Sequence, residues 1–286
     1  MNNTLVYINS MPSLIDLCRQ LQGCAWLAVD TEFERTNTYY PQLCLVQISV
    51  PGTVAVVDPL AIPDPAPLYA LLYAPAITKV FHAARQDLEL FFHLKGELPV
   101  PIFDTQVAAT LLGYERQIGY ANLVREVLGV DLPKTQTNTD WRRRPLSRRQ
   151  LEYAADDVIY LGRMYEVLLD KLIESGLLPQ FEEQCLALNR PELYAPDPGE
   201  MWRKIKLREV EEFSDRSLQV FKELAAWREV TARKENLPRK WIIKDTTLAA
   251  IARELPGDRD TLSGLDGMDE KTLRRYGEAL LQIAAG

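Results

Sequence analysis

Cysteine and histidine are scarce in this chain of 286 residues. Its cysteines and histidines are Cys18, Cys24, Cys44, Cys185, His82 and His93. Neither a C-x-x-C pair nor an H-E-x-x-H motif occurs, so the zinc sites that these residues usually build are excluded. The cysteines lie in apolar stretches such as LCLVQI, which predicts reduced, buried thiols. A metal in this protein would therefore be bound by carboxylates, which favours Mg²⁺ or Mn²⁺.

Long hydrophobic runs are also lacking. No stretch approaches the roughly 18 uncharged apolar residues of a membrane span, and the start MNNTLVYINS has no secretory signal pattern. We expect a cytoplasmic protein without a membrane partner, and no obligate protein partner is indicated. Hydrophobic residues make up 47% of the chain, enough for a real core. At roughly 100–200 residues per domain, the length suits two domains.

Positive charge is in the minority, because the net charge is −7 and the sequence pI is about 5.1. Nucleic-acid-binding domains are usually basic. Two segments are nevertheless locally basic: residues 134–150, with Arg142, Arg143 and Arg144, and residues 228–244, with Arg239, Lys240 and Lys244. Each cluster is either a nucleic-acid contact or a solvated face, and charge alone favours the solvated face.

The first part of the chain alternates strand and helix patterns. Apolar and β-branched runs predict strands over residues 25–33, 43–50, 53–58, 78–81 and 101–103. Helical periodicity and capping residues predict helices over 68–73, 85–94, 104–112, 120–128 and 147–174. The Pro51-Gly52 turn joins two of the strands as an antiparallel hairpin. The sum predicts an α/β fold with a mixed β-sheet and helices on its faces.

Beyond Gly176 the patterns are wholly helical. The segment NRPELYAPDPG (189–199) has three prolines and predicts a linker or a packed crossing segment. Helices are expected over 218–234, 247–253 and 271–285. The expected organisation is an α/β domain over 1–176, a helical, Pro-rich linker over 177–212 and a small all-α module over 213–286.

Asp30 and Glu32 stand two residues apart in the first of these strands. Side chains of a strand alternate between faces, so both carboxylates point to the same face. Neighbouring acids repel unless a cation neutralises them, and a divalent ion does this well. Asp87, in the first turn of helix 85–94, is an acid that could equally complement the helix dipole. Taken separately, each is more typical of an ordinary structural or solvated acid.

Tyr153 and Asp157 stand four residues apart on the long helix and so share a face. Asp156 is also near Tyr153, but the Y-x-x-x-D spacing favours Asp157. A phenol with a pKa near 10 is a weak base at neutral pH, so Tyr153 suits the orientation of a water better than its deprotonation. Four carboxylates in this order suit two metal ions that clamp a phosphodiester displacement.

The motifs VDTEFER, YPQLCLVQI, FHAARQDLEL, FDTQVAATLLGY and TDWRRRPLSRRQLEYAADDVIYL carry a family resemblance. Over about the first 200 residues the chain resembles the DEDDy 3′→5′ exonucleases of the ribonuclease H-like fold, and among them the ribonuclease D family. The tail, from ELAAWREVTARKENLPRKWIIKD onward, resembles an HRDC domain, a nucleic-acid-binding module. By this resemblance residues 1–176 form the exonuclease domain and residues 213–286 the HRDC domain.

The resemblance implies that Asp30, Glu32, Asp87 and Asp157 bind two divalent ions and that Tyr153 positions the attacking water. His82 is expected to be a polar contact, either local or on the substrate side, and Asp104 a helix cap. Gln47 and Gln106 match the family pattern without a derivable role. Trp241 is expected to pack in the core, because Ile242 and Ile243 follow it.

The expected function is a metal-dependent 3′→5′ exoribonuclease that trims 3′ ends of structured RNA such as tRNA precursors, releasing 5′-mononucleotides. Two alternatives stay open: a 3′→5′ DNA exonuclease with the same acids, and a catalytically silent RNA-binding scaffold. Relatives often carry two HRDC modules, and this chain has room for one. That difference bears on processivity and on the preference for structured RNA.

Overall fold

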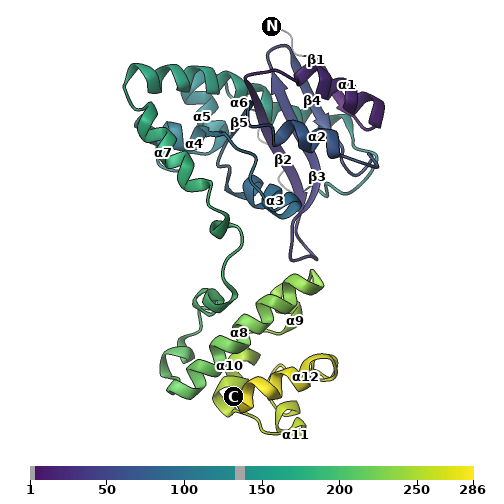
Figure 1. The fold of residues 1–286 in the computed structure, drawn as a ribbon, viewed down its shortest axis with the longest axis vertical. Helices are drawn as coiled ribbons and strands as arrows, with labels where there is room; N and C mark the ends of the chain where they lie inside the picture. Colours follow the sequence, from purple (N-terminus) through teal and green to yellow (C-terminus); the bar gives the residue numbers. More distant parts are fainter. Residues whose placement is uncertain (1–3, 133–138) are drawn as a thin grey trace. The chain divides into compact units, whose positions relative to one another are not determined.

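The computed structural model describes residues 4–132 and 139–286, which form two compact units. Unit 1 comprises residues 1–34 and 41–194, and unit 2 comprises residues 35–40 and 195–286. Figure 1 shows the sheet of unit 1 and the helices of unit 2. Within the described residues, no helix has the length and apolarity needed to cross a membrane.

A six-stranded mixed sheet forms the centre of unit 1, in the order β1-β4-β3-β2-β5-β6. Its strands are β1 (Thr4–Ile8), β2 (Trp26–Glu34), β3 (Gln42–Val50), β4 (Thr53–Val57), β5 (Thr78–Phe81) and β6 (Ile102–Asp104). The β2, β3 and β4 ladders are antiparallel, whereas β1 pairs with β4, β5 with β2 and β6 with β5 in parallel. The predicted mixed sheet and its hairpin are confirmed.

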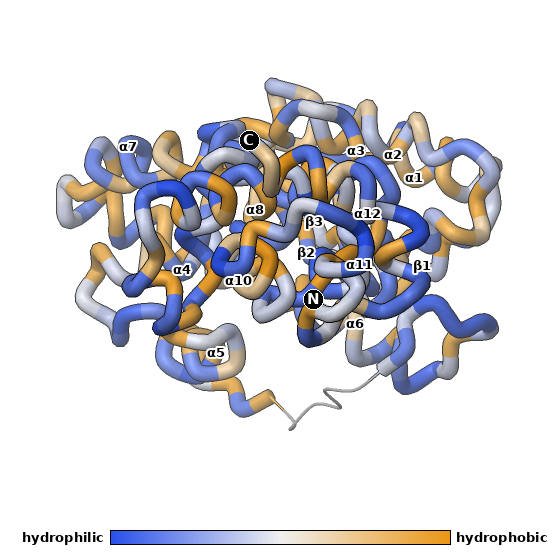
Figure 2. Tube along the Cα trace, turned by 90° about the horizontal axis from the view of Figure 1, so that it is seen from below, coloured by the Kyte–Doolittle hydropathy of each residue, from blue (hydrophilic) through white to orange (hydrophobic). Residues whose placement is uncertain are grey.

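Helices cover both faces of this sheet, as Figure 2 shows for α1–α3 on one side of β2 and β3 and α6 on the other. Alternation along the strands explains this, because Val29, Val46 and Ile48 belong to the main core while Leu45 and Val56 pack with α6. The helices are α1 (Met11–Leu21), α2 (Ala66–Leu72), α3 (Arg85–Lys95), α4 (Thr105–Leu111), α5 (Tyr120–Leu128), α6 (Arg148–Glu174) and α7 (Leu178–Leu188).

The local signals that predicted these helices are present in the structure. Ser147 and Gln150 form a capping box at the start of α6, and Asp104 caps α4 through the amides of Gln106 and Val107. Strand β1 and helix α1 were not predicted. Most of β1 is exposed, so its alternation is weak, whereas Leu14, Leu17 and Leu21 of α1 do show helical spacing.

Unit 2 is helical except for the short segment 35–40. Its elements are the 3₁₀ turns η2 (Pro198–Lys204) and η3 (Arg208–Glu212), and the helices α8 (Asp215–Glu235), α9 (Arg239–Ile242), α10 (Asp245–Glu254), α11 (Arg259–Ser263) and α12 (Glu270–Ala285). The turn η1 (Pro191–Leu193) ends the first unit. Phe221, Leu224, Leu248 and Leu280 lie in the core that α8, α10 and α12 share.

Two packing predictions had different outcomes. All four cysteines are free thiols, and Cys44 and Cys185 are buried as expected, whereas Cys18 and Cys24 are half-buried. The prediction that Trp241 packs in the core is wrong, because this residue is 58% exposed. Ile242 and Ile243 are buried instead, since the single turn of α9 points them inward and Trp241 outward.

Candidate active site

Three carboxylates meet between the sheet and helix α6. Asp30 and Glu32 come from β2 and Asp157 from α6, and one oxygen of each lies within 4.8 Å of the others. Strand alternation places the first two on the face that α6 covers. Ala154 and Ala155, small and buried on α6, allow the helix to approach that face closely. The structure thus brings together three of the four predicted acids.

Asp87 is buried at the start of α3 and lies beside this group, outside the set within 4.8 Å. Its Oδ1 accepts a 2.5 Å hydrogen bond from the hydroxyl of Thr31, the residue between Asp30 and Glu32. The carboxylate of Asp104 accepts hydrogen bonds from the amides of Ala83 and Ala84, at 3.1 and 2.9 Å. These contacts fix the chain just before α3 and so place Asp87 next to β2.

Burial raises the pKa of all four acids, and their mutual repulsion adds to the effect on Asp30 and Glu32. The pKa of Glu32 rises to about 8, through burial and then the charges of Asp157 and Asp87. Burial raises the pKa values of Asp87 and Asp157 to about 7. The pKa of Asp30 lies well above its usual range, through burial and then repulsion from Asp87 and Asp157. Such a cluster is stabilised by a bound cation.

Tyr153 lies one turn before Asp157 on α6 and hydrogen-bonds to its carboxylate. Burial, followed by the negative charges of Asp157 and Glu32, raises the pKa of the phenol. The hydroxyl therefore stays protonated at neutral pH and acts as a hydrogen-bond donor. Its ring stacks on Trp141, with centroids 5.9 Å apart and planes at 25°.

The donor set fits divalent metal ions. Carboxylate oxygens are hard ligands, and Mg²⁺ and Mn²⁺ prefer oxygen. Gln47 is paired with Asp30 in the β2–β3 ladder, so the two side chains share a face. Both polar atoms of the Gln47 amide are buried, and neither has a hydrogen-bond partner in the described parts of the chain. A ligating carboxylate is ordinarily held by such a second group, so the unpaired amide suits a metal site.

Both ring nitrogens of His82 have hydrogen-bond partners within unit 1. Its Nδ1 lies 2.9 Å from the Thr105 hydroxyl and its Nε2 lies 3.1 Å from the carbonyl oxygen of Ile118. Burial lowers the pKa of the imidazole, so it is neutral at physiological pH. Of the two expected roles, these contacts are those of a local polar residue, and both ring nitrogens of His82 are engaged within the fold.

Arg144 also has a structural environment. Its Nε and Nη2 donate to the fully buried carboxylate of Asp58 at 2.5 and 2.7 Å, and Nη1 donates to the Trp141 carbonyl at 2.6 Å. This guanidinium is thus committed to the protein. Arg142 and Arg143 of the same segment are exposed, and Arg142 pairs with Asp140 at 3.2 Å. Lys134 lies outside the described residues.

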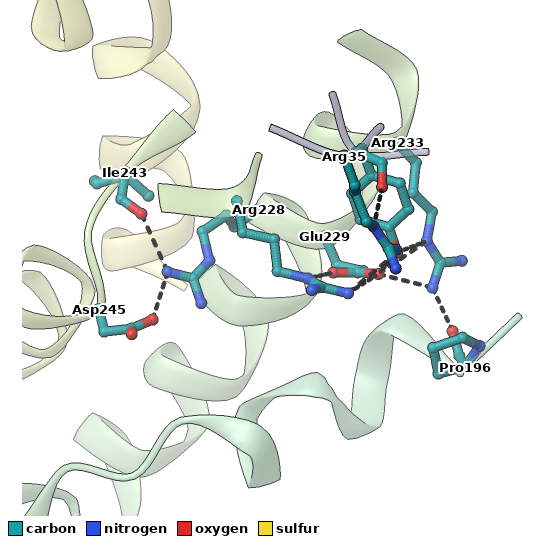
Figure 3. Close-up of polar contacts among 9 residues, drawn as sticks. Arg35, Pro196, Arg228, Glu229, Arg233, Ile243 and Asp245 are labelled. Carbon is teal, nitrogen blue, oxygen red and sulfur yellow. Dashed lines mark hydrogen bonds and ion pairs between the residues drawn. The ribbon is translucent and has the colours of Figure 1, made fainter. Parts of the chain in front are cut away.

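The basic segment of unit 2 divides in the same way. Glu229 is completely buried on α8, and its carboxylate accepts hydrogen bonds from Arg233, Arg239 and the hydroxyl of Tyr39. Figure 3 shows the guanidinium groups converging on this carboxylate, with Arg233 also reaching the carbonyl of Pro196. Arg239 is therefore tied to Glu229, whereas Lys240 and Lys244 are exposed beside Trp241.

Sequence reasoning missed three residues that contact the acids, their helix or Tyr153: Thr31, Trp141 and Tyr120. Thr31 bonds Asp87 and Trp141 stacks on Tyr153, as described above. The Tyr120 hydroxyl donates to the backbone carbonyl of Asp156 at 3.0 Å, and burial, then the charges of Asp157 and Asp30, raises its pKa. Thr31 and Trp141 lie within the motifs quoted above, but only their tertiary partners show what they do.

The chain matches known protein families over most of its length. Residues 5–173 match the 3′-5′ exonuclease family, and residues 217–284 match the HRDC domain. The chain is 40% identical to ribonuclease D of Pseudomonas paraeruginosa over 282 residues, which cover 98% of this chain and 73% of that protein. It spans about two thirds to three quarters of the length of the curated relatives it matches.

Solved structures give the same picture. The crystal structure of Escherichia coli RNase D, described as an exoribonuclease involved in structured RNA processing, matches with a TM-score of 0.88 and 37% identity. That match covers 100% of this chain and 75% of the other. Brucella melitensis NrnC with bound Mg²⁺ matches with a TM-score of 0.57 and 32% identity, over 73% of this chain and 98% of the other.

Proposed function

The chain belongs to the ribonuclease D family of 3′→5′ exoribonucleases, and we propose that it trims the 3′ ends of structured RNAs such as tRNA precursors in the cytoplasm. The observation that carries the proposal is the convergence of Asp30, Glu32 and Asp157 within 4.8 Å, with Tyr153 bonded to Asp157. The similarity to an enzyme described as processing structured RNA supports this substrate class.

We further propose two Mg²⁺ or Mn²⁺ ions held by the three clustered carboxylates and Asp87. When bound, such ions activate water and stabilise charge on the attacking and leaving oxygens of a phosphodiester. The hard oxygen ligands and the Mg²⁺ in NrnC support this choice. The RNA-facing roles of the chain's own residues follow from their positions.

In this proposal, the carboxylates of Asp30, Glu32, Asp87 and Asp157 would hold the metal ions, and the Tyr153 hydroxyl orients the attacking water. The hydroxyl donates to Asp157, so it is already fixed beside the acids. Its raised pKa keeps the proton on the phenol, so Tyr153 orients the water without acting as a general base. Stepwise cleavage from the 3′ end releases 5′-mononucleotides.

The test is a time course on a 3′-extended, tRNA-like RNA labelled at its 5′ end, with Mg²⁺, with Mn²⁺ and with excess EDTA. We expect a ladder of products that shortens one nucleotide at a time, stops near the duplex and vanishes in EDTA. Full activity in EDTA would overturn the metal mechanism, and efficient cutting of a circular RNA would overturn the exonuclease mode.

Two controls address the alternatives. A matched DNA oligonucleotide degraded faster than the RNA would favour a DNA exonuclease. An Asp30→Asn variant with unchanged turnover would favour a catalytically silent scaffold, with any residual cleavage due to a contaminant. We expect RNA to be the better substrate and Asp30→Asn to be inactive.

We also propose that two exposed surfaces contact RNA: Arg142 and Arg143 in unit 1, and Lys240, Trp241 and Lys244 in unit 2. Lysine and arginine would meet phosphates, and the exposed Trp241 ring would stack on a base. Trp241→Ala should weaken binding of single-stranded RNA by about 1–3 kcal/mol, the usual value of one stacked base. Lys240→Gln should flatten the slope of log affinity against log salt by about 0.7. Unchanged affinity and slope would show a solvated face.

A further inference from the structure

Trp141 is a buried aromatic side chain that belongs to no regular element. It precedes α6 by several residues and is 7% exposed. Its indole stacks on the ring of Tyr153 and lies in the small core that joins α6 to strands β3 and β4. The indole thus packs directly against the ring of Tyr153.

A buried ion pair holds the segment that carries Trp141. Two nitrogens of Arg144 donate hydrogen bonds to the Asp58 carboxylate. The same guanidinium donates to the carbonyl oxygens of Trp141 and Cys44, at 2.6 and 3.0 Å. Asp58 follows β4, and it also accepts a 2.6 Å hydrogen bond from the Tyr7 hydroxyl. One guanidinium therefore binds the Trp141 backbone to the sheet at two strands.

The side chains of this segment differ in their exposure. Trp141 and Arg144 turn inward, whereas Arg142 and Arg143 are exposed. Trp141 and Arg144 therefore make their contacts within the protein and not at its surface. Bidentate guanidinium–carboxylate pairs fix geometry as well as adding energy, because two parallel hydrogen bonds allow only one orientation.

We propose that Trp141, held by the Arg144–Asp58 pair, is a positioning residue that seats the ring of Tyr153. A tyrosine side chain has alternative staggered rotamers, and a change of rotamer would carry its hydroxyl away from the acids. A misplacement of about 1 Å at a reacting centre can cost about 100-fold in rate. The stacked indole restricts the ring to the rotamer in which its hydroxyl meets Asp157.

The proposal rests on the proposed role of Tyr153, and a double-mutant cycle tests it. Trp141→Ala should lower kcat about 10- to 100-fold while KM and Mg²⁺ affinity stay nearly unchanged. In a Tyr153→Phe background the same substitution should lower kcat no further, because the hydroxyl that it misplaces is already gone. Equal losses in both backgrounds, or no loss in either, would overturn the proposal.

Phe181→Ala is the matched control. Phe181 is a buried aromatic residue on α7 that packs on Phe103 with ring centroids 4.4 Å apart. Its removal should lower the melting temperature about as much as Trp141→Ala, but its effect on kcat should be the same with and without Tyr153. Should Trp141→Ala fail to fold, Trp141→Leu and Arg144→Lys replace it in the cycle with the same expected non-additivity.

A spectroscopic measurement separates the positioning of the Tyr153 ring from the proposed role of its hydroxyl in catalysis. With 3-fluorotyrosine incorporated, the ¹⁹F resonance that Tyr153→Phe removes is that of Tyr153. We expect Trp141→Ala and Arg144→Lys to shift this resonance in the metal-free protein, and Phe181→Ala to leave it in place. An unmoved resonance would overturn the positioning role of Trp141. Full turnover by Tyr153→Phe would overturn only the role of the tyrosine in catalysis.

Discussion

Both units of this protein bury carboxylates, but they treat them in opposite ways. In unit 1, burial and then repulsion from the charges of Asp87, Asp157 and Glu32 raise the pKa of Asp30. In unit 2, Glu229 is fully buried, yet its pKa is lowered. Burial alone would raise it, but hydrogen bonds from Arg239, Tyr39 and Arg233 outweigh that effect.

The difference shows what a buried acid is for. Glu229 has its cations built into the fold, so its interactions are complete and hold unit 2 together. The cluster in unit 1 gathers negative charge and leaves compensation to bound cations, which is typical of a site that works at a cost in stability. Removing an acid should therefore have opposite consequences in the two places.

The largest expected effect is on catalysis by the cluster. Asp157→Asn should reduce turnover at least about 1,000-fold, because metal ions contribute several kcal/mol to the transition state. The melting temperature of the metal-free protein should stay the same or rise, since one repelling charge is removed. Turnover and thermal denaturation in metal-free buffer measure the two effects. Asp156→Asn, one residue away, is the control and should stay active.

Glu229→Gln should have the opposite pair of effects to Asp157→Asn: a loss of stability with turnover nearly unchanged. Removing one partner of a buried ion pair usually costs about 3–5 kcal/mol. Here we expect about 2–3 kcal/mol, because the side chain of Arg239 is 36% exposed and water can compensate it. Chemical denaturation measures the loss, and Glu254→Gln, at an exposed pair, should change little. Turnover on a short RNA, at a temperature where the variant is folded, should remain near wild type.

Stability should depend on pH with opposite sign in the two units. Glu32 has a folded pKa of about 8 against an ordinary 4.5, so between these values the folded state binds more protons than the unfolded state. The metal-free protein should therefore lose stability as pH rises from about 4.5 to 8. Glu229, with a lowered pKa, stabilises above about 4.5 and loses that contribution as pH falls through its folded pKa.

Melting temperatures from pH 3 to 9 test both signs. Glu32→Gln should flatten the dependence of melting temperature on pH between about 4.5 and 8. Glu229→Gln should flatten this dependence below about pH 4.5. Saturating Mg²⁺ should also remove the loss at high pH, because its ligands bind in the deprotonated form. A wild-type profile in either variant would contradict the corresponding sign.

The smallest expected effect concerns Thr31. Its hydroxyl is a neutral hydrogen-bond donor to Asp87, whereas two arginines donate to Glu229. Loss of such a supporting group typically weakens metal binding about 10-fold or more. Thr31→Val should therefore weaken Mg²⁺ binding by about 10-fold, measured by calorimetry. Thr110→Val, whose hydroxyl donates to the Gln106 carbonyl, is the control and should leave affinity unchanged.

Sequence predicted what depends on local periodicity and on recognisable motifs. The same-face pairs Asp30 with Glu32 and Tyr153 with Asp157 follow from strand and helix repeats. The pairing of Arg144 with Asp58 and of Tyr39 with Glu229 joins residues 86 and 190 positions apart, which no local pattern encodes. Arginines in a basic run thus look alike in sequence, although the fold buries the charge of some and exposes that of others.

The segment 35–40 has a practical consequence for taking the protein apart. Because these residues belong to unit 2, that unit is assembled from two stretches separated by more than 150 residues. A fragment that begins at residue 195 would lack the Tyr39 hydroxyl that bonds Glu229 and the Tyr40 amide that bonds Asn236 at 3.0 Å. An isolated helical fragment is therefore complete only when the missing hexapeptide is grafted onto it or supplied in trans.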